Sequence, residues 1–219
     1  MKIKNIKIAI DSPAGAGAGT QSKLLSKHYN LLYLDTGKYY RILAYCKIKN
    51  PNKFNLTFIK KKIKNIKLKD LNDKKLLPNN IGIEASIISK NKKIRTLIDI
   101  TQKKYAYNPP KKYNGSCLDG RDITYKILPD ADFKFFLTAD IKTRANRRYK
   151  ELKKLNKKIK YLDVLQSIKQ RDHSDYKRRI SPLKKTKDAI LIDTTNLTIK
   201  KCFIKIRNII DEGLKKKIR

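Results

Sequence analysis

The stretch IKIAIDSPAGAGAGTQSKLL, residues 6–25, indicates the fold more strongly than any other part of the chain. It begins with a short apolar run, Ile6 to Ile10, that ends at Asp11. A glycine-rich run follows, and a helical pattern starts at Thr20. Glycines let successive backbone N–H groups turn inward, and the N-terminus of a helix adds about half a positive charge. The stretch therefore predicts a strand, a turn that binds nucleotide phosphates, and a helix.

The turn departs at two positions from the usual phosphate-binding pattern GxxxxGK[ST]. Ser12 stands for the first glycine and Ala18 for the lysine. That lysine normally follows the β- and γ-phosphates of the donor, and losing one such contact costs on the order of 10²- to 10³-fold in rate. We do not expect Lys23, one helical turn further on, or a lysine of residues 50–80 to replace it. Taken alone, the partial match is also compatible with a purely structural turn. If the turn binds ATP, the contacting residues are Ser12, Pro13, Ala14, Gly15, Ala16, Gly17, Ala18, Gly19 and Thr20.

Four further apolar runs, each followed by a polar loop, predict buried parallel strands. They span residues 31–34, 116–118, 133–137 and 189–192. Helical patterns occupy residues 20–28, 37–47, 84–105, 141–155, 162–172 and 197–211. Strands that alternate with helices predict an α/β fold with a doubly wound parallel sheet. Ligands bind beyond the carboxyl ends of such strands, so we expect the loops at Asp11, Asp35 and Asp119 to converge on one crevice.

The length of 219 residues suits one domain with a sizeable core. No stretch approaches the ~20 apolar residues of a membrane-spanning helix, and the first residues lack the pattern of a signal peptide. We therefore expect a cytoplasmic protein without a membrane partner. Cys46, Cys117 and Cys202 stand far apart, which predicts reduced, packed thiols rather than disulfides or a zinc site.

The formal net charge of +36 arises from 55 lysines and arginines against 19 acidic residues. A balance this basic is typical of proteins that bind nucleic acid or another polyanion. The excess is mostly lysine and is accompanied by much Ile, Asn and Tyr, which a strongly A/T-biased coding sequence also produces. We favour the coding bias, so a nucleic-acid partner stays open without being the favoured reading.

Four motifs, in this order, carry a resemblance to a known family: LYLDTGKYYR at residues 32–41, LDGRDI at 118–123, PDADFKFFLTAD at 129–140 and RDHSDYKRR at 171–179. The chain resembles bacterial cytidylate kinases over nearly its whole length, least at residues 50–80. The resemblance implies a P-loop NTPase fold with a five-stranded parallel sheet flanked by helices. It implies one domain, residues 1–219, with a core of residues 1–49, 106–155 and 181–219. A lobe of about residues 50–105 is implied to bind the monophosphate, and a lid of about residues 156–180 to cover it.

The same resemblance implies the reaction and its residues. The γ-phosphoryl group of ATP passes to CMP or dCMP, giving ADP and CDP or dCDP in pyrimidine nucleotide metabolism. Mg²⁺ accompanies ATP, and we expect no residue of the chain to bind a metal by itself. We also expect a monomer. The residues implied to hold CMP are Thr36, Arg41, Ser86, Arg121, Asp122, Arg171, Asp175 and Arg178, of which Arg121, Arg171 and Arg178 are catalytic. Their chemistry agrees, because guanidinium groups bind phosphate through two hydrogen bonds and a carboxylate accepts from the cytosine amino group. Spacing places Arg171, Asp175 and Arg178 on one helix face.

The departures from the family pattern leave alternatives open. Thr101 stands where the family has an arginine that reads the base, Ser174 replaces a lid arginine, and Thr124-Tyr125 replace Gly-Thr. Together with Ala18 they allow a catalytically inactive descendant that binds nucleotide or nucleic acid. UMP or AMP is also open as the acceptor. One helix face carries three arginines that approach the donor or are simply solvated: Arg144, Arg147 and Arg148.

Two segments lack clear periodicity. Residues 50–80 are rich in Lys, Asn and Ile and predict an inserted, mobile lobe. The C-terminal GLKKKIR predicts a frayed, solvated end. His28 and His173 show no partner pattern, so we expect no direct role for either.

Overall fold

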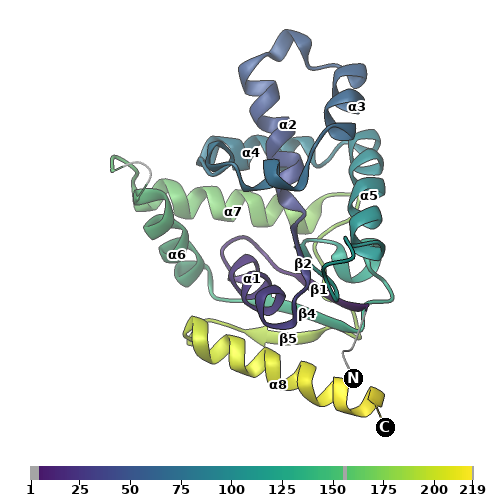
Figure 1. Ribbon diagram of the computed structural model, residues 1–219. Helices are drawn as coiled ribbons and strands as arrows, with labels where there is room; N and C mark the ends of the chain where they lie inside the picture. Colours follow the sequence, from purple (N-terminus) through teal and green to yellow (C-terminus); the bar gives the residue numbers. More distant parts are fainter. Residues whose placement is uncertain (1–4, 155–156, 219) are drawn as a thin grey trace.

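The computed structural model describes residues 5–154 and 157–218 and contains one sheet of five parallel strands (Figure 1). The strands are β1 (Ile6–Asp11), β2 (Leu32–Asp35), β3 (Gly115–Gly120), β4 (Phe133–Thr138) and β5 (Ile190–Asp193). Their order across the sheet is β2-β3-β1-β4-β5. The α/β fold with a doubly wound parallel sheet, predicted from the alternation of strands and helices, is confirmed.

The register of the central strands positions the loops that follow them. Asp11, the last residue of β1, pairs with Gly120 of β3 on one side and with Phe136 of β4 on the other. Asp35, the last residue of β2, pairs with Asp119. The carboxyl ends of β1, β2 and β3 therefore lie nearly level, and the polar loops after them begin side by side.

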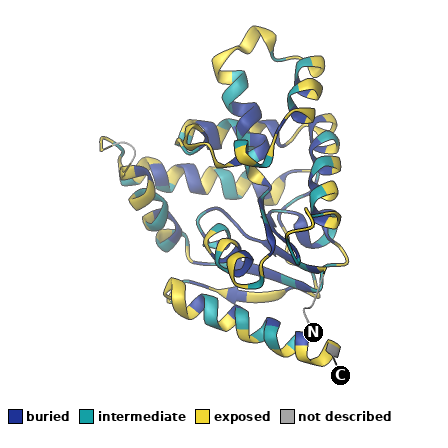
Figure 2. Ribbon diagram, viewed as in Figure 1, coloured by how far each residue is buried: buried dark blue, intermediate teal, exposed yellow. Residues whose placement is uncertain are grey.

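Eight α-helices lie within the described residues: α1 (Ala18–Tyr29), α2 (Gly37–Lys49), α3 (Leu56–Lys64), α4 (Asn79–Ile88), α5 (Lys92–Tyr107), α6 (Ile141–Lys153), α7 (Tyr161–Lys177) and α8 (Ile199–Ile218). Helices α1 and α8 cover one face of the sheet with an apolar cluster that includes Ile8 and Ile10. Helices α2 and α5 belong to a second cluster, which includes Ala9. Strand β1 thus places alternate side chains in the two apolar clusters, as expected of a strand that is buried on both faces. Figure 2 shows the buried centre of the sheet and the exposed edge strand β5.

Residues 50–80 contain regular structure that packs beside α2 and α5 (Figure 1). Besides α3 they form three 3₁₀ turns, Pro51–Lys53, Leu68–Asn72 and Lys74–Leu76. The side chain of Asn55 caps α3 by accepting from Phe58 N at 2.9 Å. Ile59 and Ile63, one turn apart, are buried among exposed lysines. The weak periodicity of this segment still produces a helix, because two isoleucines suffice to define the buried face of so short a helix.

The single helix predicted for residues 84–105 is wrong, since the chain forms α4 and α5 with a break after Ile88. The side chain of Asn91 accepts a hydrogen bond from Ile94 N at 3.1 Å and starts α5. An asparagine at this position favours a new helix start over continuation. The break turns α5 so that it packs against β3.

The C-terminal segment is helical rather than frayed, because α8 extends to Ile218 and buries Leu214. Helices α6 and α7 pack together through Ala145, Leu152, Val164 and Ile168, and α7 then passes beside α4 (Figure 1). The predicted helix end at residue 155, and the expected boundary between core and lid, lie outside the described residues. Within residues 5–154 and 157–218, no helix is long and apolar enough to span a membrane. Cys117 and Cys202 are buried and Cys46 is half-buried, all three as free thiols.

Candidate nucleotide-binding site

The glycine-rich turn connects β1 to α1 beyond the carboxyl end of the sheet's central strand. Gly15 and Gly17 adopt φ values of 78° and 94°, which favour glycine. A Cβ atom on Gly15 would lie 2.9 Å from the carbonyl oxygen of Arg144, so the close approach requires glycine as well. Helix α1 begins at Ala18, and no side chain among the described residues caps its first turn. The N–H groups of that turn are therefore available to an anion.

Two arginines of α6 hold this turn from its outer side. Arg144 is buried and donates to the carbonyl oxygen of Ala14 at 3.1 Å. Arg147 donates to the carbonyl oxygen of Thr194 at 2.6 Å, and the Thr194 hydroxyl donates to the carbonyl oxygen of Ala16 at 3.0 Å. A solvated face is therefore the wrong alternative for these two arginines. Arg144 directly, and Arg147 through Thr194, thus hold carbonyl oxygens of the turn in place.

Asp11 is buried and turns away from the crevice. Its carboxylate accepts hydrogen bonds from Ile123 N (2.8 Å), Thr124 N (2.9 Å) and the Thr124 hydroxyl (2.6 Å). Burial raises the pKa of Asp11 to about 6, against the lowering effect of these hydrogen bonds. The loops after β1, β2 and β3 begin side by side, but the Asp11 side chain itself holds the π-helical turn Ile123–Ile127 against β1.

Asp35, the last residue of β2, pairs with Asp119, the next-to-last residue of β3. A Cβ atom on Gly19 would lie 3.7 Å from Asp119 Oδ2. Asp119 is buried, and its Oδ1 has no hydrogen-bond partner in the part of the chain that the structure describes. Burial, and then the neighbouring Asp35, raise the pKa of Asp119 well above its ordinary value. A cation at this point would lower that pKa again.

Guanidinium groups from several elements meet opposite the turn. Arg41 of α2 donates to the carbonyl oxygen of Leu76 at 2.7 Å, and burial, Arg171 and Arg148 lower its pKa to about 9. Burial and Arg121 lower the pKa of Arg171, on α7, to about 10. Arg171 Nε has no hydrogen-bond partner among residues 5–154 and 157–218. Cations that lower one another's pKa in this way repel until an anion lies between them.

Asp175 of α7 links two of the expected catalytic arginines. Its carboxylate lies 2.7 Å from Arg121 Nε and 3.5 Å from Arg178 Nη1. Burial alone would raise the pKa of Asp175, but the surrounding guanidinium groups lower it. Helix α7 ends at Lys177, so Arg178 approaches from the following loop and donates to the carbonyl oxygen of Ser181 at 2.6 Å. The helix face predicted for three residues therefore carries only Arg171 and Asp175.

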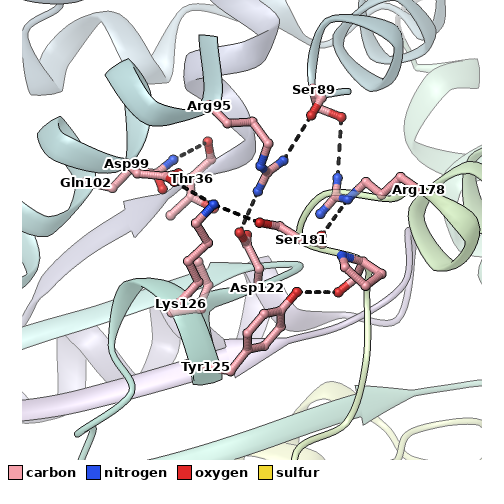
Figure 3. A network of polar contacts seen from close by, with 12 residues as sticks. Thr36, Ser89, Arg95, Asp99, Gln102, Asp122, Tyr125, Lys126, Arg178 and Ser181 are labelled. Atoms are coloured by element: carbon pink, nitrogen blue, oxygen red, sulfur yellow. Dashed lines mark hydrogen bonds and ion pairs between the residues drawn. The ribbon is translucent and has the colours of Figure 1, made fainter. Parts of the chain in front are cut away.

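A buried ion pair joins α5 to the loop after β3 (Figure 3). Arg95 Nη2 lies 2.5 Å from Asp122 Oδ2, and the two side chains are 3% and 7% exposed. Arg95 also donates to the carbonyl oxygen of Ser89 at 3.2 Å, and Arg178 donates to the Ser89 hydroxyl at 3.4 Å. Hydrogen bonds to Ser89 therefore fix two guanidinium groups, of which Arg95 pairs directly with the buried Asp122.

Sequence analysis missed Arg95, although a signal was present. Arg95, Asp99 and Gln102 recur at i, i+4 and i+7 of α5 and are all buried. Asp99 pairs with Lys126 at 3.0 Å, and Gln102 donates to the carbonyl oxygen of Thr36 at 3.2 Å. Polar side chains repeated on the buried face of a helix rarely serve packing alone, because each needs a partner.

Comparison with known proteins agrees with this geometry. Residues 8–212 match the family model described as cytidylate kinase. The chain belongs to the cytidylate kinase family. The cytidylate kinase of Clostridium tetani (strain Massachusetts / E88) is 40% identical and covers 95% of each chain. That of Clostridium botulinum (strain Langeland) is 40% identical over 94% of this chain and 98% of its own, and that of Mesomycoplasma hyopneumoniae (strain 7448) is 38% identical over 90% of each.

A solved structure adds support for the fold. The crystal structure of an uncharacterized protein from Eubacterium ventriosum matches with a TM-score of 0.55 and 17% identity, covering 94% of this chain and 99% of that one. At this identity the match concerns the arrangement of elements alone. The five-stranded parallel sheet with flanking helices, together with membership of the cytidylate kinase family, agrees with the expected P-loop NTPase fold.

The remaining family positions have defined neighbours. The Ser86 hydroxyl of α4 lies 3.3 Å from the Ser174 hydroxyl of α7. The Thr36 hydroxyl donates to the carbonyl oxygen of Asp119 at 2.7 Å. Thr101, expected at the position of a base-reading arginine, donates to the carbonyl oxygen of Leu97 in its own helix at 3.5 Å.

Proposed function

We propose that the protein is a cytidylate kinase that transfers the γ-phosphoryl group of ATP to CMP or dCMP, giving ADP and CDP or dCDP. The observation that carries the proposal is the cluster of guanidinium groups opposite the glycine-rich turn: Arg41, Arg121, Arg148 and Arg171. The pKa of Arg41 is lowered to about 9 and that of Arg171 to about 10. Arg121 and Arg148 each pair with a carboxylate, whereas Arg41 and Arg171 pair with none in the described part of the chain, so the phosphates of donor and acceptor supply the further negative charge that this cluster favours.

The division of the chain is part of this proposal. Residues 1–49, 106–155 and 181–219 form the core, and about residues 50–105 form the lobe that binds the monophosphate. About residues 156–180 form the lid. We further propose that the protein acts as a monomer in the cytoplasm.

In the transfer step, an oxygen of the CMP phosphate attacks the γ-phosphorus of ATP. The bond from that phosphorus to the β–γ bridging oxygen breaks, and ADP leaves with the electron pair. Arg41 binds the acceptor phosphate, and Arg121 and Arg171 stabilise the charge on the transferred group. Asp175 holds the Arg121 guanidinium in place at 2.7 Å. Catalysis of this kind is mainly positioning and electrostatics.

The proposed base pocket lies around Asp122. A carboxylate accepts from the amino group of cytosine, which uracil lacks. Arg95 fixes Asp122 from one side and offers donors to the ring, while Arg178 and Ser86 line the pocket. We therefore propose that Arg95, and not a residue at position 101, is the base-reading arginine. This arrangement favours CMP over UMP as acceptor.

Mg²⁺ fits the carboxylates at the start of α1. The oxygen of Asp119 that lacks a partner and the adjacent Asp35 are hard oxygen ligands, which Mg²⁺ prefers. The described residues hold no group of three or more acidic, His or Cys side chains that could bind a metal alone. Mg²⁺ is usually held by one or two carboxylates together with substrate phosphates. When bound, it neutralises charge on the donor oxygens, and Asp119 and Asp35 keep it at the mouth of the turn.

Ala18 favours one second candidate, an inactive descendant that only binds nucleotide. The decisive experiment gives purified protein ATP, Mg²⁺ and CMP and measures CDP, with dCMP, UMP and AMP as parallel acceptors. We expect CDP from the natural protein and a rate increase on the order of 10²-fold from Ala18→Lys. No CDP from either protein refutes the kinase. RNA binding at low salt that weakens steeply toward physiological salt would instead support a nucleic-acid partner.

A further inference from the structure

We propose that Lys38 supplies the cation that Ala18 no longer provides, by binding the transferred phosphoryl group from the side of α2. The inference rests on the proposed function. It assigns to the second residue of α2 a catalytic role that the glycine-rich turn normally fulfils. In the usual P-loop, this lysine lies at the start of the helix that follows the glycine-rich turn, and it binds the β- and γ-phosphates from there.

The first support is the position of Lys38 among the elements around the phosphate-binding turn. A cavity of about 440 Å³ runs along the edge strand β2, lined among others by Lys23 of α1, Asp35 of β2 and Lys38 of α2. A Cβ atom on Gly37 would lie 3.3 Å from Asp35 Oδ1, so the start of α2 touches this carboxylate. Asp35 adjoins Asp119, which faces Gly19. Lys38 thus shares a cavity with Lys23 of α1 and lies close to the pair of carboxylates of which one faces Gly19.

The second support is the charge around Lys38. Burial lowers the pKa of its ammonium, Asp35 opposes this effect, and three cations add to it. Those cations are Arg41, Lys23 and Arg148, which come from α2, α1 and α6. The Lys38 ammonium forms no hydrogen bond or ion pair within the described residues. Asp35 balances only part of the charge of this half-buried group of cations, so the γ-phosphate of ATP would find a favourable partner in the Lys38 ammonium.

Lys23 is the alternative, since it lies one turn after Ala18. Its side chain is exposed, and its ammonium lies 5.8 Å from the centre of the Tyr33 ring. A solvated cation that rests on an aromatic ring gains less from a phosphate than a half-buried one without a partner. Lys38 is therefore the stronger candidate, and Lys23 serves as the competing variant in the test.

The test compares Lys38→Met in two backgrounds, the natural chain and Ala18→Lys. Methionine keeps the apolar stem and removes the ammonium. Lys49→Ala, an exposed lysine at the other end of α2, is the matched control, and thermal unfolding verifies that each variant folds. In the natural background we expect kcat for CDP formation to fall about 10²-fold. In the Ala18→Lys background we expect a loss of less than about 5-fold, because the restored lysine provides the same contact.

A second readout does not depend on turnover. Lys38→Met should weaken binding of a non-hydrolysable ATP analogue more than binding of ADP, because the lost contact is to the γ-phosphate. An equal loss of kcat in both backgrounds, or no loss in the natural chain, overturns the proposal. If Lys23→Met instead lowers kcat strongly in the natural chain and little in the Ala18→Lys background, the role belongs to Lys23 and the proposal for Lys38 is overturned. If neither the natural chain nor Ala18→Lys forms CDP, the proposed function itself fails, and this inference fails with it.

Discussion

Replacing Arg95 by methionine tests the buried ion pair on which the proposed base pocket depends. The change keeps most of the side-chain volume but leaves Asp122, 7% exposed, without its guanidinium partner at 2.5 Å. Removing one partner of a buried pair typically costs about 3–5 kcal/mol, because the remaining charge stays buried. The carbonyl oxygen of Ser89 also loses its donor, which adds about 1 kcal/mol. We expect the free energy of unfolding to fall by about 5 kcal/mol.

The assay is urea unfolding of Arg95→Met and of the double variant Arg95→Met/Asp122→Leu. The double variant should regain most of the lost stability, since it no longer buries a lone carboxylate. In kinase assays, Arg95→Met should narrow the preference for CMP over UMP by about tenfold, as expected for the loss of a hydrogen bond to a charged group. A fall of less than about 1 kcal/mol in the free energy of unfolding of Arg95→Met, with an unchanged preference for CMP over UMP, would refute the reasoning.

Three further perturbations probe the phosphate-binding turn. The folded state raises the pKa of Asp11 to about 6 from 3.8, so the carboxyl contributes stability at low pH that is lost as pH rises through 6. We measure the free energy of unfolding of Asp11→Asn and of the natural chain in urea at pH 4 and pH 7. From pH 4 to pH 7 the difference between the two should change by about 2 kcal/mol in favour of the variant, and a difference that does not depend on pH contradicts this. Arg144→Ala removes the donor to Ala14 and the 2.6 Å ion pair with Asp172, and calorimetric unfolding should show a loss of about 3 kcal/mol. Gly15→Ala places a Cβ atom 2.9 Å from a backbone oxygen at φ 78°. Titration with a non-hydrolysable ATP analogue should show at least about tenfold weaker binding, and unchanged affinity would mean that the turn tolerates the clash.

The strand, turn and helix of residues 6–25 could be predicted because they depend on near neighbours in the chain. Apolar residues define β1, and glycine is required where φ is 78° at Gly15 and 94° at Gly17. The order of strands and helices then predicts a parallel sheet, whose loops gather at the carboxyl ends. The motifs around Arg41 and Arg121 pointed to phosphate binding for the same local reason, since each follows a strand end.

The partners of charged residues could not be predicted in this way. Asp11 binds Ile123 N, 112 residues away, and Arg95 binds Asp122, 27 residues away. Sequence periodicity reports only on neighbours within one or two helical turns, so it could not give the partners of Asp11 and overlooked Arg95. The end of α7 at Lys177, which separates Arg178 from its helix, likewise depends on the contact with Ser181.

The sequence by itself thus determined that this protein has a nucleotide-binding α/β fold, and that its turn lacks the usual lysine. Only the tertiary structure decided which cations face the turn. Lys38 and Arg148 come from different helices, and each becomes a neighbour of the other only after α2 and α6 pack around the end of the sheet. The physical reason is that charge interactions act through space over several ångströms, whereas spacing along the chain fixes only which residues share one element.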